Sequence, residues 1–250
     1  MRGRMKIVVT IMLFMVMVAG GKSYTVSAAE ETDAYKVIWE DNFDGTALDR
    51  NIWNVEVNGD GGGNQEHQYY VDNRDNIEVS NGTLKIRALN RSYMGKGYTS
   101  GRINTRGKAE FKYGKVEARI KLPKFQGAWP AFWMLGANYG SVGWPRCGEI
   151  DIMEAINKEN FTHGALHWYA AGGQKDSGGN TQAFIPSDFD RTQWHTYAIE
   201  WNKESIKWLV DDVVFYTQAL DGYMGEFRKE QFIILNLAVG GQWPGHTIDN

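Results

Sequence analysis

The sequence predicts an all-β protein, built as a sandwich of antiparallel sheets. Two observations support this prediction. Short segments in which apolar and polar residues alternate recur along the chain, and 29 glycines punctuate them. No segment shows a sustained helical period of apolar residues. The chain has 250 residues, a length at which an all-β sandwich commonly forms one domain.

The strands are expected where alternation or continuous burial is clearest. The predicted segments are 83–88, 115–122 and 194–201, which alternate; 206–217, which is typical of a hairpin turning at Asp211-Asp212; and 232–239, an unbroken apolar run. A continuous apolar run of this length indicates a strand that is buried on both faces. The segment between Glu149 and Glu154 is a further strand, and it carries the chemistry discussed below.

The first 28 residues resemble a secretory signal peptide. Arg2, Arg4 and Lys6 precede an apolar run over residues 7–19, and small residues near position 28 offer a cleavage site. An uncleaved membrane anchor is the alternative, although the run is short for a bilayer. We therefore expect a signal peptide over 1–28, a flexible lead-in over 29–34 and a single domain over 35–250, in a secreted protein with no membrane contact after cleavage.

Charge and cysteine content narrow the possible partners. Residues 1–28 contain four basic and no acidic side chains, so their removal changes the formal charge from −3 to −7. An acidic surface disfavours nucleic acid and is compatible with a neutral polymer. The single cysteine, Cys147, excludes an intrachain disulfide. The 10 tryptophans suit a core, and they also suit a sugar-binding cleft, where rings stack on sugar faces.

The strongest chemical signal is the segment Glu149-Ile150-Asp151-Ile152-Met153-Glu154. In a strand, Glu149 and Asp151 share one face, and the isoleucines share the other. Glu154 lies five positions after Glu149, so a regular strand would turn it into the core. A β-bulge near Ile152 or Met153 would return it to the face of the other two acids.

The spacing of the acids suits glycoside hydrolysis. With one residue absorbed by a bulge, the two glutamate Cα atoms lie about four strand steps apart, roughly 13 Å. Side chains that lean together would place the carboxyl groups ~5–6 Å apart, near the separation in retaining glycosidases. Asp151 between them would raise at least one pKa, as a general acid requires. The alternative, a solvated acidic sheet edge, fits poorly with the apolar residues between the acids.

These residues resemble the active-site motif of glycoside hydrolase family 16, in a form with an additional Met before the last Glu. Four other segments agree in order and spacing with the family, and most with its endo-β-1,3-glucanases, the laminarinases. They are 64–70 (NQEHQYY), 127–135 (GAWPAFWML), 163–168 (HGALHW) and 238–245 (AVGGQWPG). The similarity covers nearly all of the chain after the leader.

The resemblance implies a fold, an activity and roles for the acids. The fold is a concanavalin-like β jelly roll of two curved antiparallel sheets with a concave substrate cleft. The activity is retaining cleavage of β-1,3-glucan without a catalytic cofactor. Glu149 corresponds to the nucleophile, Asp151 to the residue that assists it, and Glu154 to the acid/base.

Other positions match the family's cleft. Trp129 and Trp133 are expected to contact the substrate, and Trp144, in the loop before the catalytic strand, is expected to line the cleft. His167 alternates with Leu166 and Trp168, so it should face the cleft if Leu166 is in the core. The remaining positions expected at substrate subsites or at the rim of the cleft are Asn64, Glu66, Arg102 and Trp243. For each of these residues except Trp243, an ordinary structural role is the alternative.

The resemblance also implies a structural calcium ion, for which Glu40 is a candidate ligand, and a final strand. Nothing after the 243–245 loop resembles that strand, so we expect the domain to lack it. We further expect a monomer.

Three functional alternatives stay open: cleavage of mixed-linkage glucan, agarose or carrageenan; transglycosylation by the same intermediate; and a carbohydrate-binding, lectin-like domain that does not cut. A binding module has no need of two glutamates bracketing an aspartate, and sulfated substrates would require a basic cleft. Endo and exo action are not distinguished by the sequence.

Overall fold

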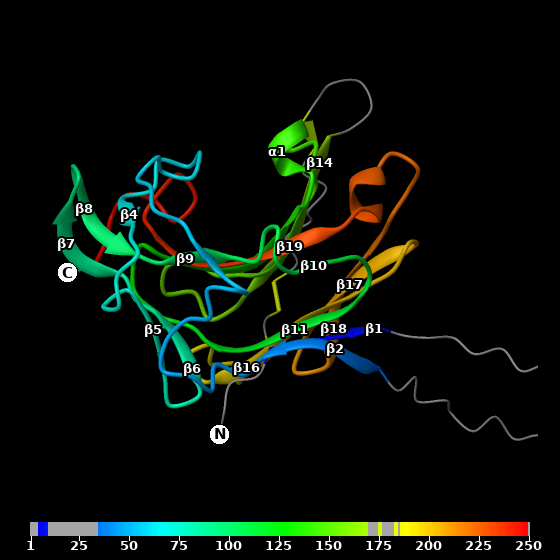
Figure 1. The fold of residues 1–250 in the computed structure, drawn as a ribbon, viewed down its shortest axis with the longest axis horizontal. Helices are drawn as coiled ribbons and strands as arrows, with labels where there is room; N and C mark the ends of the chain where they lie inside the picture. Colours follow the sequence, from blue (N-terminus) through cyan, green and yellow to red (C-terminus); the bar gives the residue numbers. More distant parts are fainter. Residues whose placement is uncertain (1–4, 10–34, 170–174, 177–182, 185, 250) are drawn as a thin grey trace, which may run out of the picture.

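Two antiparallel sheets lie face to face and make up most of the structure, a computed structural model (Figure 1). It describes residues 5–9, 35–169, 175–176, 183–184 and 186–249. The first sheet has six strands in the order β18-β17-β16-β11-β1-β2. Their bounds are Met5–Val9 for β1, Lys36–Asp41 for β2, Gly114–Lys121 for β11, Trp194–Trp201 for β16, Ser205–Val210 for β17 and Val213–Ala219 for β18.

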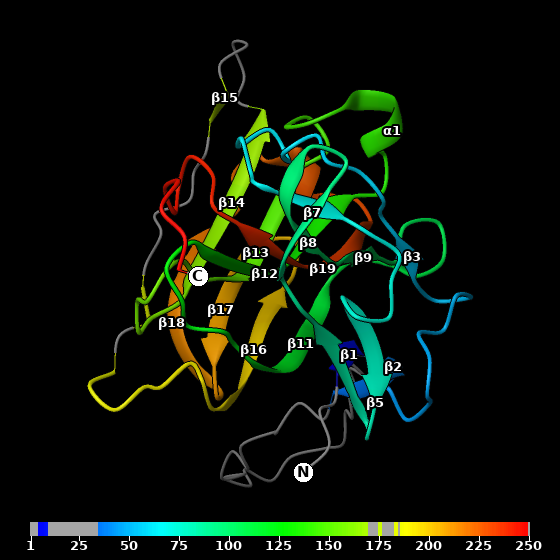
Figure 2. The ribbon, with the colours of Figure 1, turned by 90° about the vertical axis from the view of Figure 1, so that its left-hand side faces the viewer.

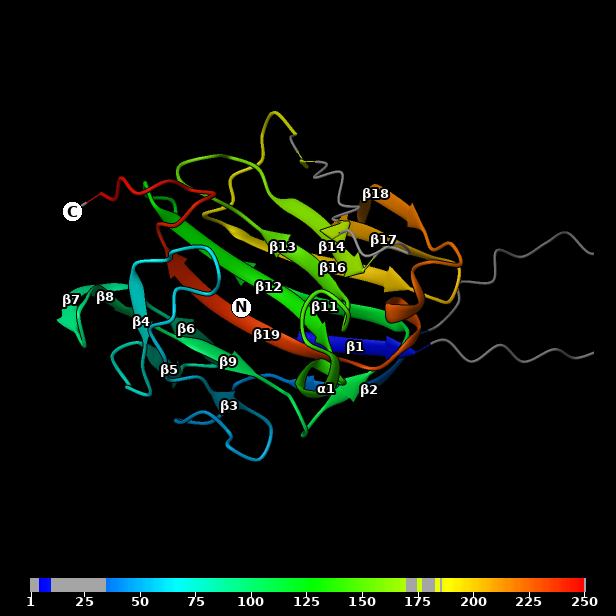
Figure 3. The ribbon, with the colours of Figure 1, turned by 90° about the horizontal axis from the view of Figure 1, so that it is seen from above.

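The second sheet has eight strands and supports the cleft. Its order is β15-β14-β13-β12-β19-β9-β3, and β10 pairs with β19 beside this path. The bounds are Asn54–Val55 for β3, Arg102–Asn104 for β9, Glu110–Phe111 for β10, Ala128–Gly136 for β12, Glu149–Glu154 for β13, His163–Tyr169 for β14, Lys175–Asp176 for β15 and Gln231–Val239 for β19. Strands β9, β19, β12, β13 and β14 run side by side in this order when seen from above (Figure 3).

Two small sheets and two short helical turns complete the described part of the chain. One small sheet is β4 (Gln68–Tyr70), β8 (Lys96–Ser100) and β7 (Leu89–Tyr93), in which β4 and β8 are parallel; the other pairs β5 (Ile77–Ser80) with β6 (Thr83–Ile86). The helical elements are α1 (Tyr139–Val142) and the 3-10 turn η1 (Gly225–Arg228). In Figure 1, the β4–β8–β7 sheet lies at the left end of the eight-stranded sheet, and α1 lies above its β14 end. Among the described residues, no helix is long and apolar enough to cross a membrane.

Side-chain alternation explains the main strands. In β11, Val116 and Ala118 are buried between the sheets. The predicted hairpin is confirmed: Asp211 and Asp212 adopt φ angles of 48° and 64°, the left-handed pair that a two-residue hairpin turn requires. All nine residues of β19 are buried, as its continuous apolar run predicts. The expected all-β sandwich is therefore confirmed.

The core fills the space between the two sheets. It includes large side chains from both, among them Phe132, Met134, Ile199 and Trp208, each 0% exposed. Burial of such side chains contributes about 1.5–3 kcal/mol each to folding. The core also fixes which face of the eight-stranded sheet turns outward, because any one-residue slip in register would turn these side chains to solvent.

Five residues of the predicted leader take part in the fold. Strand β1 lies between β11 and β2 and pairs antiparallel with both. In the uncleaved chain, residues 5–9 pair with the facing edges of β2 and β11, which offer backbone hydrogen-bonding groups, and the signal peptide over 1–28 stays a prediction. The lead-in at 29–34 and the remainder of 1–28 fall outside the described residues. Cleavage of the leader would remove β1 from this sheet.

Candidate active site

The predicted bulge is present in β13. On the β14 side, Asp151 is opposite Ala165 and Glu154 is opposite His163, so three steps along β13 match two along β14. The register with β12 shifts at the same place, where Phe132 is opposite Met153 and Trp133 is opposite Asp151. One additional residue is accommodated in β13, which restores the parity of Glu154.

Burial shows what the bulge achieves. Ile150, Ile152 and Met153 are at most 2% exposed and belong to the core. Glu149 and Glu154 lie on the other face, where they line the cleft together with Asp151. The bulge therefore places two consecutive side chains, Ile152 and Met153, in the core and returns Glu154 to the cleft. The neighbouring strands β14, β13 and β12 can be followed in Figure 2.

Glu149 and Glu154 each accept a hydrogen bond from an indole. Trp129 Nε1 donates to Glu154 Oε1 at 2.8 Å, and Trp144 Nε1 donates to Glu149 Oε2 at 3.0 Å. Trp129 comes from β12, whereas Trp144 comes from the loop before β13. Trp129 is only 9% exposed, while Trp144 is 44% exposed and offers a ring face to a ligand. The expectation that both line the cleft agrees with these positions.

His167 lies beside the acids on β14. Its Nε2 is 3.3 Å from Asp151 Oδ2 and 3.7 Å from Glu149 Oε1. Leu166 and Trp168 on either side of it are buried, as the alternation predicts. The Nε2 atom therefore faces Glu149 and Asp151, and when the ring is protonated it stabilises their negative charge.

Burial raises the pKa of all three acids. For Glu149 and Asp151 the pKa lies well above the usual range, first because burial removes solvent and then because another carboxylate is near. Burial also raises the pKa of Glu154, whereas the hydrogen bond from Trp129 and the charge of His167 lower it. Since neighbouring carboxylates resist full ionisation, the group retains a proton to a higher pH than separate acids would. A retained proton is what a general acid needs.

A second group of polar side chains lines the cleft toward β9. Arg102 Nε is 3.0 Å from Glu56 Oε2, and its guanidinium carbon lies 4.8 Å from the centre of the Trp133 ring. Trp133 Nε1 donates to Asn236 Oδ1 at 2.7 Å. Trp133 and Arg102 thus sit in the cleft as expected, and the ion pair with Glu56 fixes the orientation of Arg102.

Glu66 is buried, at 6% exposed, and does not lie on a solvated loop. Its Oε2 accepts hydrogen bonds from Gln68 Nε2 at 2.6 Å and from the Tyr70 hydroxyl at 3.3 Å. Burial raises its pKa above the usual value, although these donors lower it. Asn64 is next to this group and also lines the cleft. Both predicted residues therefore lie at the cleft, on the side of Glu154.

Trp243 marks the same end of the cleft. Its ring centre is 5.4 Å from that of Trp129 at an interplanar angle of 82°, and 5.0 Å from that of His163. It is 38% exposed. An exposed indole packed edge-to-face on a fixed one is a suitable surface for stacking a sugar ring.

Three further residues belong to this network without having been predicted from the sequence: Asn236, Tyr70 and Glu56. Asn236 Nδ2 donates to the Tyr70 hydroxyl at 3.3 Å and so joins Trp133 to the Glu66 group. One signal was available: Asn236 is the single polar residue in the apolar run 232–239. A polar side chain in a strand buried on both faces requires partners, which indicates a site. Nothing comparable marks Glu56.

The cleft has a volume of about 840 Å3. Its walls come from β9, β12, β13 and β19, from the segment after β3, and from the loops around Asn64 and Trp144. The ionisable residues that line it include six acids and two bases: Glu56, Asp60, Glu66, Glu149, Asp151 and Glu154, with Arg102 and Arg106. A cleft of this charge suits a neutral polymer better than a sulfated one.

Calcium binding at Glu40 gains no support from side-chain geometry. Glu40 is exposed on β2. Among the described residues, the one group of three or more His, Cys, Asp or Glu side chains close enough to share an ion is Glu149, Asp151 and His167. Glu40 belongs to no such group, and we assign it no part in the mechanism.

Comparison with known proteins identifies the family. Residues 64–250 match the family described as glycosyl hydrolases family 16. The chain belongs to this family. It is 41% identical over 234 residues to a β-glucanase of Rhodothermus marinus, covering 87% of this chain and 80% of that protein. It is also 41% identical over 230 residues to a glucan endo-1,3-β-glucosidase of Cryptopygus antarcticus, covering 85% of this chain and 83% of that protein.

A solved structure shows that the similarity extends to the fold. The endo-β-1,3-glucanase of Pyrococcus furiosus superposes with a TM-score of 0.76 at 42% identity, covering 85% of this chain and 86% of that one. Membership of family 16 makes the chain a glycoside hydrolase with a β jelly-roll fold, as the resemblance implied. The hydrolytic chemistry of the family needs no cofactor.

Proposed function

We propose that this family 16 enzyme is a retaining, endo-acting hydrolase of β-1,3-glucan. The observation that carries the proposal is the face of β13, where the bulge brings Glu149, Asp151 and Glu154 into one cleft. The relatives named above are called glucanases or glucosidases acting on β-1,3-glucan or β-glucan. The acidic lining supports a neutral glucan over carrageenan.

The two glutamates suit the two steps of double displacement. In the first step, the Glu154 carboxyl gives its proton to the glycosidic oxygen while the Glu149 carboxylate attacks the anomeric carbon. The bond to the leaving sugar breaks, and an ester joins Glu149 to the remaining sugar. In the second step, Glu154 takes a proton from water, and the oxygen of that water displaces Glu149. Two inversions give net retention.

The neighbours of each glutamate support these roles. The Trp144 N–H and the nearby His167 ring stabilise the ionised form of Glu149, which is the form that attacks. Asp151 is buried beside Glu149, and when Asp151 is ionised its charge raises the pKa of Glu149, which makes the Glu149 carboxylate more basic. Burial raises the pKa of Glu154, which favours the protonated form that a general acid needs, although burial raises the pKa of Glu149 as well.

Aromatic surfaces flank both glutamates and support endo action. Trp144 lies at Glu149, and Trp243 packs on Trp129 at Glu154. Both are exposed enough to stack a sugar ring. Sugars on either side of the cleaved bond would then have a surface to bind, as cleavage inside a chain requires. We also propose that the enzyme acts as a monomer and that it acts outside the cell, which the leader supports.

The test is hydrolysis of laminarin, lichenan and agarose in parallel. We expect laminarin to be cleaved fastest, with a mixture of oligosaccharides appearing early, and with the β anomer first in the NMR spectrum of the products. Release of glucose alone from the outset would contradict endo action. An initial α anomer would contradict retention, and faster cleavage of agarose would contradict the substrate.

A further inference from the structure

Asn157 joins three segments on the Glu154 side of the cleft. It follows β13 closely, and its backbone N–H donates to Ala128 O at 2.9 Å, so the contact with β12 continues past Glu154. Its φ angle of 52° lies in the left-handed region, which asparagine adopts more readily than most residues. The side chain is not among those that line the cleft.

The Asn157 side chain holds a different segment with each of its polar atoms. Oδ1 accepts hydrogen bonds from Gly127 N and from Gln126 Nε2, both at 2.8 Å. Nδ2 donates to Pro244 O at 3.0 Å. One amide therefore ties the start of β12 to the loop that follows β19, although the two segments are more than a hundred residues apart in sequence.

Arg191 holds the Asn157 backbone from the core side. This arginine is 0% exposed, and it donates to Ile156 O at 3.1 Å and to Asn157 O. A buried guanidinium that binds two successive carbonyl oxygens restricts their movement. The Asn157 side chain therefore projects from a fixed point.

The segments that Asn157 ties together carry the two indoles beside Glu154. Gly127 precedes Trp129 by two residues, and Pro244 follows Trp243 directly. The two indoles pack edge-to-face, and Trp129 Nε1 donates to Glu154 at 2.8 Å. Movement of either segment would change the approach of Trp129 to Glu154.

We propose that Asn157 is a positioning residue for the acid/base: it fixes Trp129 against Glu154 and Trp243 against Trp129 without touching the substrate. This inference rests on the proposed role of Glu154. The hydrogen bond from Trp129 favours the ionised carboxylate and so lowers the pKa of Glu154. Without Asn157 that bond weakens, the pKa of Glu154 rises, and the protonated form persists to higher pH. The basic limb of kcat/KM against pH, which reports the acid in the free enzyme, then moves upward.

Two substitutions separate the two ties. Asn157→Ala removes both, so we expect kcat to fall by roughly 10- to 100-fold and the basic limb to rise by about half a pH unit or more. Asn157→Asp keeps the acceptor for Gly127 but places a carboxylate oxygen against Pro244 O. We expect it to raise KM roughly 3- to 10-fold through Trp243, with a smaller change in kcat.

Asn202→Ala is the matched control. The Asn202 side-chain oxygen also accepts two backbone hydrogen bonds, from Glu204 N and Ser205 N at 2.8 Å, but in a turn away from the cleft. We expect it to leave kcat, KM and both pH limbs unchanged. Active-site titration normalises all variants to the amount of folded enzyme.

Two outcomes would overturn the proposal. One is an Asn157→Ala enzyme with the pH limbs and kinetic constants of the control; the other is lower activity with an unmoved basic limb, which indicates a purely structural role. If Asn157→Ala does not fold, an Asn157→Asp enzyme with unchanged KM overturns it. If the wild-type enzyme cleaves no glucan, the proposed function fails, and an NMR titration of ¹³C-labelled Glu154 still tests whether Asn157→Asp alters its environment.

Discussion

The indole N–H of Trp144 donates a hydrogen bond to Glu149 Oε2 at 3.0 Å. Trp144 lies in a loop and is 44% exposed, whereas Glu149 is the first residue of β13. The same indole lies 6.0 Å from the His167 ring, centre to centre. One residue therefore combines a hydrogen bond to the proposed nucleophile with an open ring face for sugar. Its two contributions can be separated by a substitution that keeps an aromatic ring and removes the N–H.

Trp144→Phe should slow the enzyme by changing the ionisation of Glu149. Loss of the N–H donor destabilises the carboxylate, so the pKa of Glu149 rises further and the acidic limb of kcat/KM moves to higher pH. We expect kcat/KM near neutrality to fall by roughly 10-fold, as the loss of a hydrogen bond to a charged group implies. The measurement is the pH dependence of kcat/KM on laminarin.

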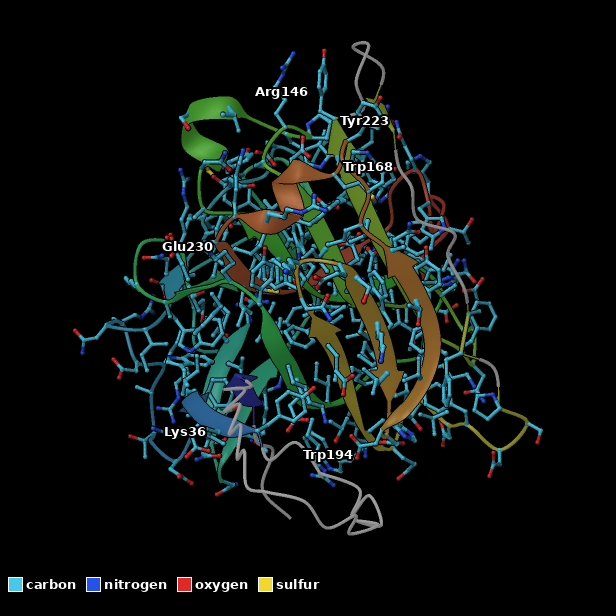
Figure 4. All side chains as sticks on the ribbon, turned by 90° about the vertical axis from the view of Figure 1, so that its right-hand side faces the viewer. Lys36, Arg146, Trp168, Trp194, Tyr223 and Glu230 are labelled. Carbon is cyan, nitrogen blue, oxygen red and sulfur yellow. The ribbon has the colours of Figure 1, made fainter. Side chains whose placement is uncertain are left out.

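Trp194→Phe is the control for this change. Trp194 is likewise exposed, at 37%, but begins β16 and lies at the end of the molecule opposite Arg146 and Trp168 (Figure 4). Its substitution should leave both pH limbs in place. A Trp144→Phe enzyme with an unmoved acidic limb would show that the hydrogen bond does not affect the nucleophile.

Glu149→Ala should abolish hydrolysis and respond to azide in a diagnostic way. Removing the nucleophile should lower kcat by on the order of 10⁴-fold or more. Azide can enter the space left by the carboxylate and attack from the same side, which gives an α-glycosyl azide in a single displacement. Glu154→Ala, tested with a substrate that has an activated leaving group, should instead give the β-azide. Reversed products would show that the roles of Glu149 and Glu154 are the opposite of those proposed. Glu200→Gln, on β16, is the control and should be fully active.

Asp151→Asn should stabilise the fold at neutral pH. Because the pKa of Asp151 is raised in the folded state, folding binds protons above the pKa of the unfolded chain, and stability falls as pH rises through that range. Asp151 Oδ2 is buried and accepts no well-aligned hydrogen bond, although His167 Nε2 lies 3.3 Å away. A neutral asparagine removes the free-energy cost of burying this carboxyl group. The free energy of unfolding at pH 7 should therefore increase by about 1–3 kcal/mol, which raises Tm by several degrees, and the increase should be smaller near pH 4.

Activity provides the second readout for Asp151→Asn. Loss of the neighbouring negative charge lowers the pKa of Glu149, so the acidic limb of kcat/KM should move to lower pH while kcat falls. Asp188→Asn, an exposed aspartate outside the cleft, should change neither Tm nor the pH profile. Equal Tm gains at pH 4 and pH 7 would show that ionisation of Asp151 is not the cause.

Because of the bulge in β13, we expect opposite effects on activity from deleting one residue of this strand and from inserting one. Deleting Met153 leaves the acids at alternate positions of a regular strand, so they stay on the cleft face. We expect a folded enzyme with reduced but measurable activity, destabilised by roughly 2–5 kcal/mol because Met153 is a core side chain. Inserting one alanine between Met153 and Glu154 separates the glutamates by six positions. If the bulge persists, the parity of Glu154 is reversed, and if it is lost, Glu154 lies two strand steps farther from Glu149; either change should remove activity. Circular dichroism and laminarin hydrolysis of the two variants provide the comparison, and an active insertion variant would refute the parity argument.

The sequence by itself determined the strands with clear alternation or a continuous apolar run, and the cluster of acids on β13. Period-two alternation in 115–122 and 194–201 is a local property, and it survives in the fold because the core accepts only one register. The need for a bulge followed from counting, since five positions separate Glu149 from Glu154 and a carboxylate is costly in a core. The resemblance to family 16 rested on the same residues.

Only the tertiary structure decided how the acids are supported. The partners of Glu149 and Glu154 are indoles from a loop and from a neighbouring strand, and no local pattern predicts which indole N–H meets which carboxylate. The burial of Glu66 and the link from Asn157 to Pro244 depend on strands that are distant in sequence. Hydrogen bonds and pKa values depend on distances of a few ångströms, and these distances are set when the sheets and their loops pack together.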